Sequence, residues 1–312
     1  MVDLVTRVPR LPQAGETLAG YSFSLGYGGK GGNQAVTAAR LGAHVTLVTR
    51  IGSDVFGDGA LANYVAAGFD VRYVLRDAQR ATGVATILVD DAAQNCIAIA
   101  PGANSALSAA DVEAANDAIA AADVVVCQLE VPVAAVIAAF RIARAAGVKT
   151  IFNPAPAAAV PDEVWQLTDL ATPNETEAEL LTGIRAGDDE QALRAAQALR
   201  ARGARAVILT LGTRGSLVVT PDGSERILPV RVDAVDSTGA GDAYVGTLAV
   251  CVAAGLSLVE AAQRANLVAA LSVTRAGTQT SFPDLRSAEA FVAQHGLTLL
   301  AAASSAGVKM EY

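Results

Sequence analysis

From Ala43 onward, the chain alternates short β-branched runs with longer segments in which Ala and Leu recur at helical spacing. The run "DVVVCQLE" precedes "PVAAVIAAFRIARAAG", and "VKTIFN" begins the next unit. Continuously apolar strands separated by amphipathic helices are typical of a parallel sheet that is covered by helices on both faces. The alternation therefore predicts an α/β fold with a mainly parallel central sheet.

Most of the expected strands end in Gly, Asn or an acidic residue. The run before α-helical "PVAAVIAAF" ends at Glu130, and "VKTIFN" ends at Asn153. Ligands of open α/β sheets bind beyond the carboxyl ends of the strands. We therefore expect the functional site at this edge of the sheet.

Two segments, residues 15–29 and 81–104, break the rhythm because polar and apolar residues alternate in them. This pattern predicts half-exposed antiparallel strands. We place them in a small separate β layer, although extra edge strands of the main sheet fit the period equally well. After Asp242 the chain is predicted to be mostly helical, and the tail "LTLLAAASSAGVKMEY" has no assignment.

The charge pattern excludes several classes of partner. The 312 residues carry 31 acidic against 23 basic side chains, a net charge of -8, and show no basic stripe, so nucleic acid is not expected as a partner. The longest apolar run, near "VPVAAVIAAF", is interrupted by Arg141 and Arg144 and is too short to span a membrane. No membrane partner is expected.

The cysteines and the start of the chain bear on location. Cys96, Cys127 and Cys251 are widely spaced in apolar surroundings, which indicates neither a disulfide framework nor a CxxC metal site. The first residues mix charge and proline and lack the apolar core of a signal peptide. A cytoplasmic location is the expectation.

The stretch "GYGGKGGNQAVTAARLG" places Gly26, Gly28 and Gly31 at the GxGxxG spacing ahead of a helical segment. The preceding "YSFSL" alternates, and no acid ends the next strand, so a dinucleotide site is not supported. A tight turn at a helix start is the simpler interpretation. Lys30 and Asn33 nevertheless provide hydrogen-bond donors that suit a polyhydroxylated ligand.

The stretch "DSTGAGD" is more informative. Gly239, Ala240 and Gly241 leave backbone N–H groups open at a helix start, where an anionic phosphate is stabilised. Asp242 in the first turn is either a favourable charge at the helix start or a general base acting on a hydroxyl that attacks phosphorus.

Two further stretches admit a structural and a functional interpretation. In "TPNETEAELLTG", Asn174 and Glu177 have nearly the spacing of a capping box, and an acid with an amide at a strand end also suits Mg²⁺ bound through water. In "LTLGTRG", Thr210 and Gly212 belong either to a hairpin turn or to a loop that leaves room for a nucleotide.

These stretches together resemble a known family. "GGKGGNQAVTAARLGAHVTLVTRIGSDVFG" and "DSTGAGDAYVGTLA" are similar to the two signatures of the ribokinase-like sugar kinases, and the resemblance extends from Asp3 to about Pro283. It implies one ribokinase-like kinase domain over residues 1–312, a Rossmann-like three-layer sandwich. A small β-sheet lid, formed by about residues 15–29 and 81–104, would close over the sugar and form a homodimer contact.

The resemblance also assigns roles to residues. Asp242 corresponds to the catalytic base, and Gly239, Ala240 and Gly241 to the anion hole. The substrate contacts it implies are Asp3, Gly29, Lys30, Asn33, Glu130 and Asp242. The implied ATP contacts are Asn174, Thr210, Gly212 and Asn266. At the position of Asn266, family members often carry His. The implied metal sites are Glu177 for Mg²⁺ and, for K⁺, Asp236 with carbonyls near Thr238, Ser272, Arg275 and Gly277 and the side chain of Ser281.

The activity implied by the resemblance is ATP-dependent phosphorylation of D-ribose at O5, giving D-ribose 5-phosphate, with Mg²⁺ and K⁺ as cofactors. A deoxyribokinase, or a nucleoside or other sugar kinase of the same family, is the alternative. A non-catalytic sugar-binding protein is a further alternative, against which the complete "GAGD" stretch argues.

The start of the chain departs from the family pattern. Met1, Val2 and Asp3 occupy the position of the family's Asn-x-Asp sugar motif, and no strand precedes them. Loss of an interior strand would leave unpaired backbone groups in a buried sheet. We therefore expect the natural product to begin upstream, with roughly a dozen further residues forming a strand. The alternative is that the apolar tail beyond Gly296 fills part of the gap.

Overall fold

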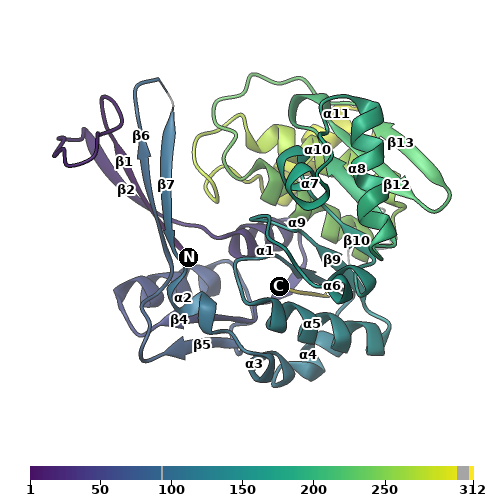
Figure 1. The fold of residues 1–312 in the computed structure, drawn as a ribbon, viewed down its shortest axis with the longest axis horizontal. Coiled ribbons are helices and arrows are strands. Elements are labelled where there is room, and N and C mark those ends of the chain that lie inside the picture. The colour runs from purple at the N-terminus through teal and green to yellow at the C-terminus, as the bar shows by residue number, and fades with distance from the viewer. Residues whose placement is uncertain (93, 301–308) are drawn as a thin grey trace.

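A computed structural model describes residues 1–92, 94–300 and 309–312. Its main feature is an eight-stranded sheet (Figure 1). In spatial order the strands are β13 (Gly223–Ile227), β12 (Ser216–Thr220), β11 (Ala206–Thr210), β10 (Leu170–Ala171), β9 (Lys149–Phe152), β8 (Val124–Cys127), β14 (Lys309–Glu311) and β3 (His44–Thr46). Only the pairs β11–β12 and β12–β13 are antiparallel in this sheet, so the expectation of a mainly parallel sheet is confirmed.

Helices cover both faces of this sheet. One apolar core contains residues from α1 (Lys30–Arg40), α2 (Val55–Ala66), α9 (Ala240–Ala253), α10 (Leu258–Ser272) and α11 (Leu285–Gln294). The other contains residues from α3 (Ala109–Glu113), α4 (Asn116–Ala120), α5 (Val133–Ala146), α6 (Asp162–Gln166), α7 (Glu175–Thr182) and α8 (Asp189–Ala201). Along β8, Val124 and Val126 belong to the first core and Val125 to the second, as the two-residue period of a strand requires. The fold is a three-layer α/β sandwich.

A second sheet stands apart from the main one (Figure 1). Its order is β2 (Ser22–Tyr27), β1 (Val2–Arg7), β6 (Val84–Val89) and β7 (Asn95–Ala100). The separate β layer expected from residues 15–29 and 81–104 is thus present, and the edge-strand interpretation is wrong. Residues 15–21 lie outside any strand, whereas β1 was not expected, because its parallel pairing with β6 joins segments that are distant in the sequence.

The run "HVTLVTRIG" contains two short strands. β3 lies in the main sheet, whereas β4 (Thr49–Gly52) pairs in parallel with β5 (Val74–Asp77) in a two-stranded sheet. Between them, the backbone N–H of Val48 donates to the carbonyl of Tyr312 over 2.8 Å. The chain therefore passes from the main sheet to the two-stranded sheet at Val48, beside Tyr312.

The carboxyl-terminal strand β14 occupies an interior position, between β8 and β3, and is parallel to both. Met310 pairs with Val45 on one side and Val124 on the other, and its side chain is fully buried. The alternative expectation, that the tail fills part of the gap in the sheet, is confirmed for residues 309–312. Residues 301–308 of the tail lie outside the described part of the chain.

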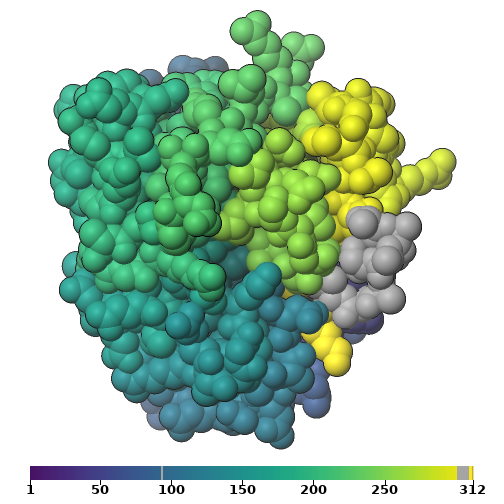
Figure 2. All heavy atoms as spheres, turned by 90° about the vertical axis from the view of Figure 1, so that its right-hand side faces the viewer, coloured from purple at the N-terminus to yellow at the C-terminus, as the bar shows by residue number. Residues whose placement is uncertain are grey.

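Figure 2 shows the face on which the carboxyl-terminal half, green to yellow, lies above the teal segment that contains α3 to α5. Within residues 1–92, 94–300 and 309–312, no helix combines the length and the apolar character that crossing a bilayer requires.

Candidate active site

Asp242 lies in the first turn of α9, among polar side chains from α1 and from the strand ends. Its side chain is buried, although the residue before it is exposed. Asn33 Nδ2 donates to Asp242 Oδ2 over 2.8 Å, and Gln34 Nε2 donates to Asp242 Oδ1 over 3.1 Å. Both carboxylate oxygens therefore have defined partners on α1.

The charge state of Asp242 is set by opposing effects. Burial raises the pKa of this carboxyl, while the positive charge of Lys30 and the hydrogen bonds from Asn33 and Gln34 lower it. A buried carboxyl with a raised pKa in the first turn of a helix has the properties that a general base needs.

The start of α9 provides open backbone N–H groups. Gly239 has φ 78°, and a Cβ there would lie 2.8 Å from Thr278 Cγ2, so only glycine fits this position. A Cβ at Gly241 would meet nothing within 4 Å. The end of this 14-residue helix thus faces free space, as the predicted anion hole requires.

The residues expected to contact the sugar gather beside Asp242. Gly29 precedes α1 with φ 85°, and Glu130 Oε2 accepts a hydrogen bond from the Lys30 N–H over 2.7 Å. Asp3 packs against Gly28, where a Cβ would collide with its carboxylate. Burial raises the pKa of Asp3 and of Glu130, and the charge of Asp242 contributes to both shifts.

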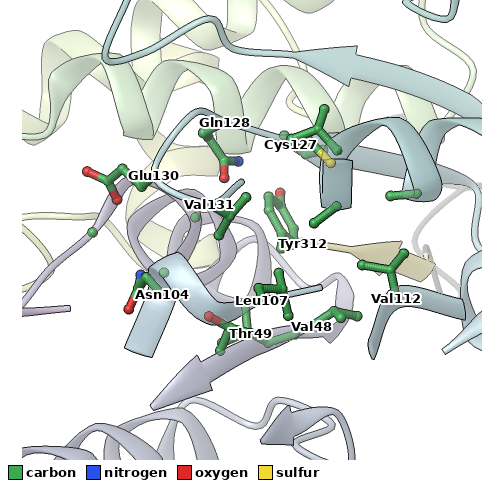
Figure 3. Close-up of a pocket in the computed structure, with 18 of the residues that line it drawn as sticks. Val48, Thr49, Asn104, Leu107, Val112, Cys127, Gln128, Glu130, Val131 and Tyr312 are labelled. Atoms are coloured by element: carbon green, nitrogen blue, oxygen red, sulfur yellow. The ribbon is translucent and has the colours of Figure 1, made fainter. Parts of the chain in front are cut away.

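A cavity of about 70 Å³ lies next to these residues (Figure 3). Glu130 and Gln128 border it at one end, and the ring of Tyr312 stands among apolar side chains from several elements. The apolar lining residues include Val48, Leu107, Val112, Val131 and Val136. The carboxyl-terminal residue of the chain thus forms part of the wall behind the polar cluster.

The candidate nucleotide side begins at α7. Asn174 Oδ1 accepts from the Glu177 N–H, and Glu177 Oε2 accepts from the Asn174 N–H, both over 2.8 Å. The capping-box interpretation is therefore confirmed. Burial raises the pKa of Glu177, opposed by its hydrogen bond to Asn174 and by the charge of Lys30. The charges of Lys30 and Asp242 also act on this carboxylate, so the cap does not remove it from the site.

The loop after β11 is a hairpin turn. β12 pairs antiparallel with β11, with Thr210 opposite Ser216, and Gly212 in the turn has φ 52°. Thr210 also forms an isolated parallel β-bridge with Asn174, so these two predicted nucleotide contacts lie side by side at neighbouring strand ends. Asn266 on α10 instead donates to the Leu228 carbonyl over 3.2 Å.

Asp236 lies in the loop before α9, which the structure places beside the segment around residues 272–281. Its Oδ1 accepts from the Thr238 N–H and Oγ1, over 2.9 and 2.7 Å, and its Oδ2 accepts from the Gly277 N–H over 3.0 Å. Burial alone would raise the pKa of Asp236, but these hydrogen bonds together lower it below its usual range. Asp236 is therefore an ionised scaffold for the loop.

The other residues predicted at this loop keep local partners. Ser272 Oγ donates to the Ala269 carbonyl and Ser281 Oγ to the Thr278 carbonyl, each over 2.8 Å. The backbone N–H of Arg275 donates to the Ser272 carbonyl over 3.4 Å. The residues predicted to bind K⁺ thus come from two separate segments of the sequence, around Asp236 and around residues 272–281.

Sequence reasoning missed the buried amides around Asp242, namely Gln34, Gln128, Asn153 and Gln279. A signal existed for some of them. Gln128 lies near the end of the run "DVVVCQLE", Asn153 ends the run "VKTIFN", and Gln34 follows Asn33 directly. Buried amides require partners, and these partners lie around the site.

A helix start open to an anion, with a buried carboxylate beside it on a parallel α/β sheet, defines the site of a phosphoryl-transfer enzyme. Residues 1–285 match the model of the pfkB family carbohydrate kinases. The chain belongs to this family.

Individual relatives agree with this assignment. The chain is 43% identical to mouse (Mus musculus) ribokinase over 288 residues, which cover 91% of this chain and 89% of that protein. It is 37% identical to the deoxyribokinase of Salmonella typhi over 286 residues, 91% of this chain and 94% of that one. The structure of Arabidopsis thaliana ribokinase complexed with ribose and ATP superposes with a TM-score of 0.84 at 30% identity, over 93% of this chain and 95% of that one.

Proposed function

We propose that this protein catalyses ATP-dependent phosphorylation of D-ribose at O5 to give D-ribose 5-phosphate. The observation that carries the proposal is the position of Asp242, buried between the polar cluster at Gly29 and Glu130 and the open start of α9. The names of the ribokinase relatives, and the ribose and ATP in the Arabidopsis structure, support this choice of substrates.

In the proposed reaction, the sugar lies against Asp3, Asn33 and Glu130, with its 5-hydroxyl at Asp242. The Asp242 carboxylate takes the hydroxyl proton as O5 bonds to the γ-phosphorus and ADP leaves with the electrons of the broken P–O bond. The N–H groups at Gly239 to Gly241 stabilise the charge that develops on the phosphoryl oxygens.

The donor set allows both proposed metals. Glu177 is a single buried carboxylate beside the site, which suits Mg²⁺ held mainly by water and phosphate oxygens. No cluster of three or more His, Cys, Asp or Glu that could hold a metal occurs among the described residues. Bound Mg²⁺ would neutralise phosphate charge. For K⁺, Asp236 keeps the loop carbonyls near Gly277 in place.

The β sheet of β1, β2, β6 and β7 is proposed as the lid that excludes water from the transfer. Both faces of this sheet expose large apolar side chains. By the strand register, Phe23 and Leu25, 64% and 46% exposed, lie on one face, and Ile97 and Ile99, 50% and 52% exposed, lie on the other face with Asp3. We propose that the face with Phe23 and Leu25, which points away from Asp3, forms a homodimer. A cytoplasmic location is also proposed, supported by the free and exposed Cys96.

The sugar specificity is the part of the proposal that most needs an experiment, because a deoxyribokinase is among the relatives. We would measure kcat/KM with ATP for D-ribose, 2-deoxy-D-ribose and a set of nucleosides. D-Ribose is expected to exceed 2-deoxy-D-ribose by at least ~10-fold, since a buried group left without its hydroxyl partner lowers kcat/KM. Equal or higher kcat/KM for the deoxy sugar would make the protein a deoxyribokinase. Ribose binding without ADP release under any Mg²⁺ and K⁺ conditions would make it a sugar-binding protein.

A further inference from the structure

A chain of two side-chain amides leads to one oxygen of Asp242. Gln128 Nε2 donates to Gln34 Oε1 over 2.6 Å, and Gln34 Nε2 donates to Asp242 Oδ1 over 3.1 Å. Gln34 Nε2 also donates to Asn153 Oδ1 over 3.0 Å, and Asn153 Nδ2 donates to the Thr172 carbonyl over 2.8 Å. This chain fixes Gln34 to two strand ends of the main sheet.

A second amide chain leads to the other oxygen. Asn63 Nδ2 donates to Gln279 Oε1 over 3.0 Å, Gln279 Nε2 donates to Asn33 Oδ1 over 3.1 Å, and Asn33 Nδ2 donates to Asp242 Oδ2 over 2.8 Å. Arg40 Nη1 also donates to the backbone carbonyl of Gln279 over 2.6 Å. The segment that contains Gln279 is therefore tied to α1 at two points.

The direction of donation is the same in both chains. An ionised carboxylate only accepts hydrogen bonds, so the inner amides, Asn33 and Gln34, must present their NH₂ groups to it. The outer amides of Gln128 and Gln279 donate to the carbonyl oxygens of the inner pair, in agreement with that orientation. The Thr172 carbonyl can only accept from Asn153 Nδ2, so Asn153 Oδ1 faces Gln34 Nε2 and supports the same orientation of Gln34. All four inner and outer amides are at most 8% exposed, so water does not readily replace a lost partner.

We propose that Gln34, Gln128 and Gln279 are positioning residues for the phosphoryl transfer. They act on Asp242 through oriented hydrogen bonds that hold both carboxylate oxygens in place and keep the group ionised. This inference rests on the proposed role of Asp242 as the base. Gln279 belongs to the segment beside Asp236. A movement of that segment would therefore alter the hydrogen bond from Gln279 to Asn33, and through Asn33 the position of Asp242.

The charges around Asp242 make these donors necessary. The groups that interact electrostatically with it include the cation of Lys30 and the carboxyl groups of Asp3, Glu130 and Glu177. Burial favours the protonated form of Asp242, and Lys30, Asn33 and Gln34 oppose it. Loss of one amide donor therefore raises the pKa of the base.

The test uses Gln34→Met, which keeps the side-chain length and removes the donor to Asp242. We expect kcat to fall about 10-fold, the ribose KM to change less than about 3-fold, and the acid limb of the kcat/KM profile to move up by about one pH unit. Gln128→Met, which does not touch Asp242, should shift the acid limb in the same direction by a smaller amount.

Thr37→Val is the matched control. Thr37 lies on the same helix, is fully buried, and donates to the Asn33 backbone carbonyl and not to Asp242. Its acid limb should stay at the wild-type position. A fall in kcat for Gln34→Met that equals that of Thr37→Val, with no shift of the acid limb, would show a structural role only and overturn the proposal.

A second readout does not depend on turnover. In protein labelled with ¹³C at aspartate carboxyl carbons, the Asp242 resonance is assigned by its absence in Asp242→Asn. A higher titration midpoint in Gln34→Met, or in Gln128→Met if the first variant does not fold, supports the proposal. An unchanged midpoint overturns it. A wild-type protein that phosphorylates no sugar would overturn the proposed function, while this titration would still decide the role of the amides.

Discussion

Asp236 and Asp242 stand at the two ends of one short motif, yet the structure gives them opposite surroundings. Asp242 is buried at a helix start and accepts hydrogen bonds from side chains of α1, which is distant in the sequence. Asp236 is partly exposed and accepts mainly from local donors, the N–H and hydroxyl of Thr238, with Gly277 completing the set.

The pKa values of the two acids therefore shift in opposite directions. Burial dominates at Asp242 and raises its pKa, whereas the hydrogen bonds at Asp236 outweigh burial and lower it. A carboxyl with a raised pKa can exchange a proton with substrate, while one with a lowered pKa stays ionised and holds a loop. The roles proposed for these two chemically identical residues, base and scaffold, thus rest on their different neighbours.

The largest expected effect follows from removing the base. Asp242→Asn should lower kcat by at least ~10²-fold, because general base catalysis contributes about that factor. Ribose affinity, measured by calorimetry, should change far less, since Asp3, Asn33 and Glu130 remain. Asp236→Asn serves as the comparison variant and should lower kcat only a few-fold. Near-normal kcat in Asp242→Asn would remove the contrast between the two acids.

The next effect concerns the glycines between them. Gly239→Ala should lower kcat about 10-fold and the free energy of unfolding by about 2 kcal/mol, because an L-residue is strained at φ 78° and its Cβ would lie 3.0 Å from the Phe282 ring. Chemical denaturation and steady-state kinetics would measure both changes.

Gly241→Ala is the matched variant for that experiment. Its Cβ meets nothing within 4 Å, and alanine favours the helix by up to about 1 kcal/mol, so stability should be unchanged or higher. Turnover should still fall if phosphate occupies the space in front of Gly241. Normal turnover in Gly241→Ala would place the phosphoryl group elsewhere.

The sequence predicted the parts of this site that depend on local patterns. The glycines and Asp242 were found because a helix start with small residues is visible in adjacent positions. The amides of Gln34, Gln128 and Gln279 were not, because their meaning depends on which strand end and loop lie opposite α1. Burial and partners of this kind arise only from tertiary packing.

The same distinction holds for the fold. The alternating pairs of strand and helix from Ala43 onward were predicted from their period. β1 was not, because its pairing with β6 joins segments that are far apart in the chain, and the tail that contains β14 was expected in the sheet only as an alternative. Met310 is apolar, but nothing in its immediate sequence shows that the position between β8 and β3 is open to it.

A smaller effect is expected at the scaffold. Asp236→Asn should lower kcat a few-fold at saturating substrate and reduce the response to potassium, because the Gly277 N–H loses an ionised acceptor and the nearby loop is held less firmly. Kinetics in potassium and in a large inert cation, at constant ionic strength, would measure the response. A wild-type kcat that is the same in both cations would contradict the proposed K⁺ site.

The smallest effect is the pH dependence of stability, which should differ in sign between the two acids. Because the folded pKa of Asp242 is raised, the folded state binds more protons than the unfolded state above pH ~4, and wild-type stability falls with rising pH there. The Tm of Asp242→Asn minus that of the wild type should therefore rise as the pH increases from about 4 to 7.

The lowered folded pKa of Asp236 has the opposite consequence, since its contribution to stability is present above pH ~4 and is lost as the pH falls. The Tm of Asp236→Asn minus that of the wild type should therefore fall as the pH increases through the range below about 4, by about 1 to 2 °C. Differential scanning calorimetry in potassium-free buffers would measure both slopes. Slopes of the same sign would contradict the assignment of base and scaffold, because that assignment depends on opposite proton affinities at the two ends of the motif.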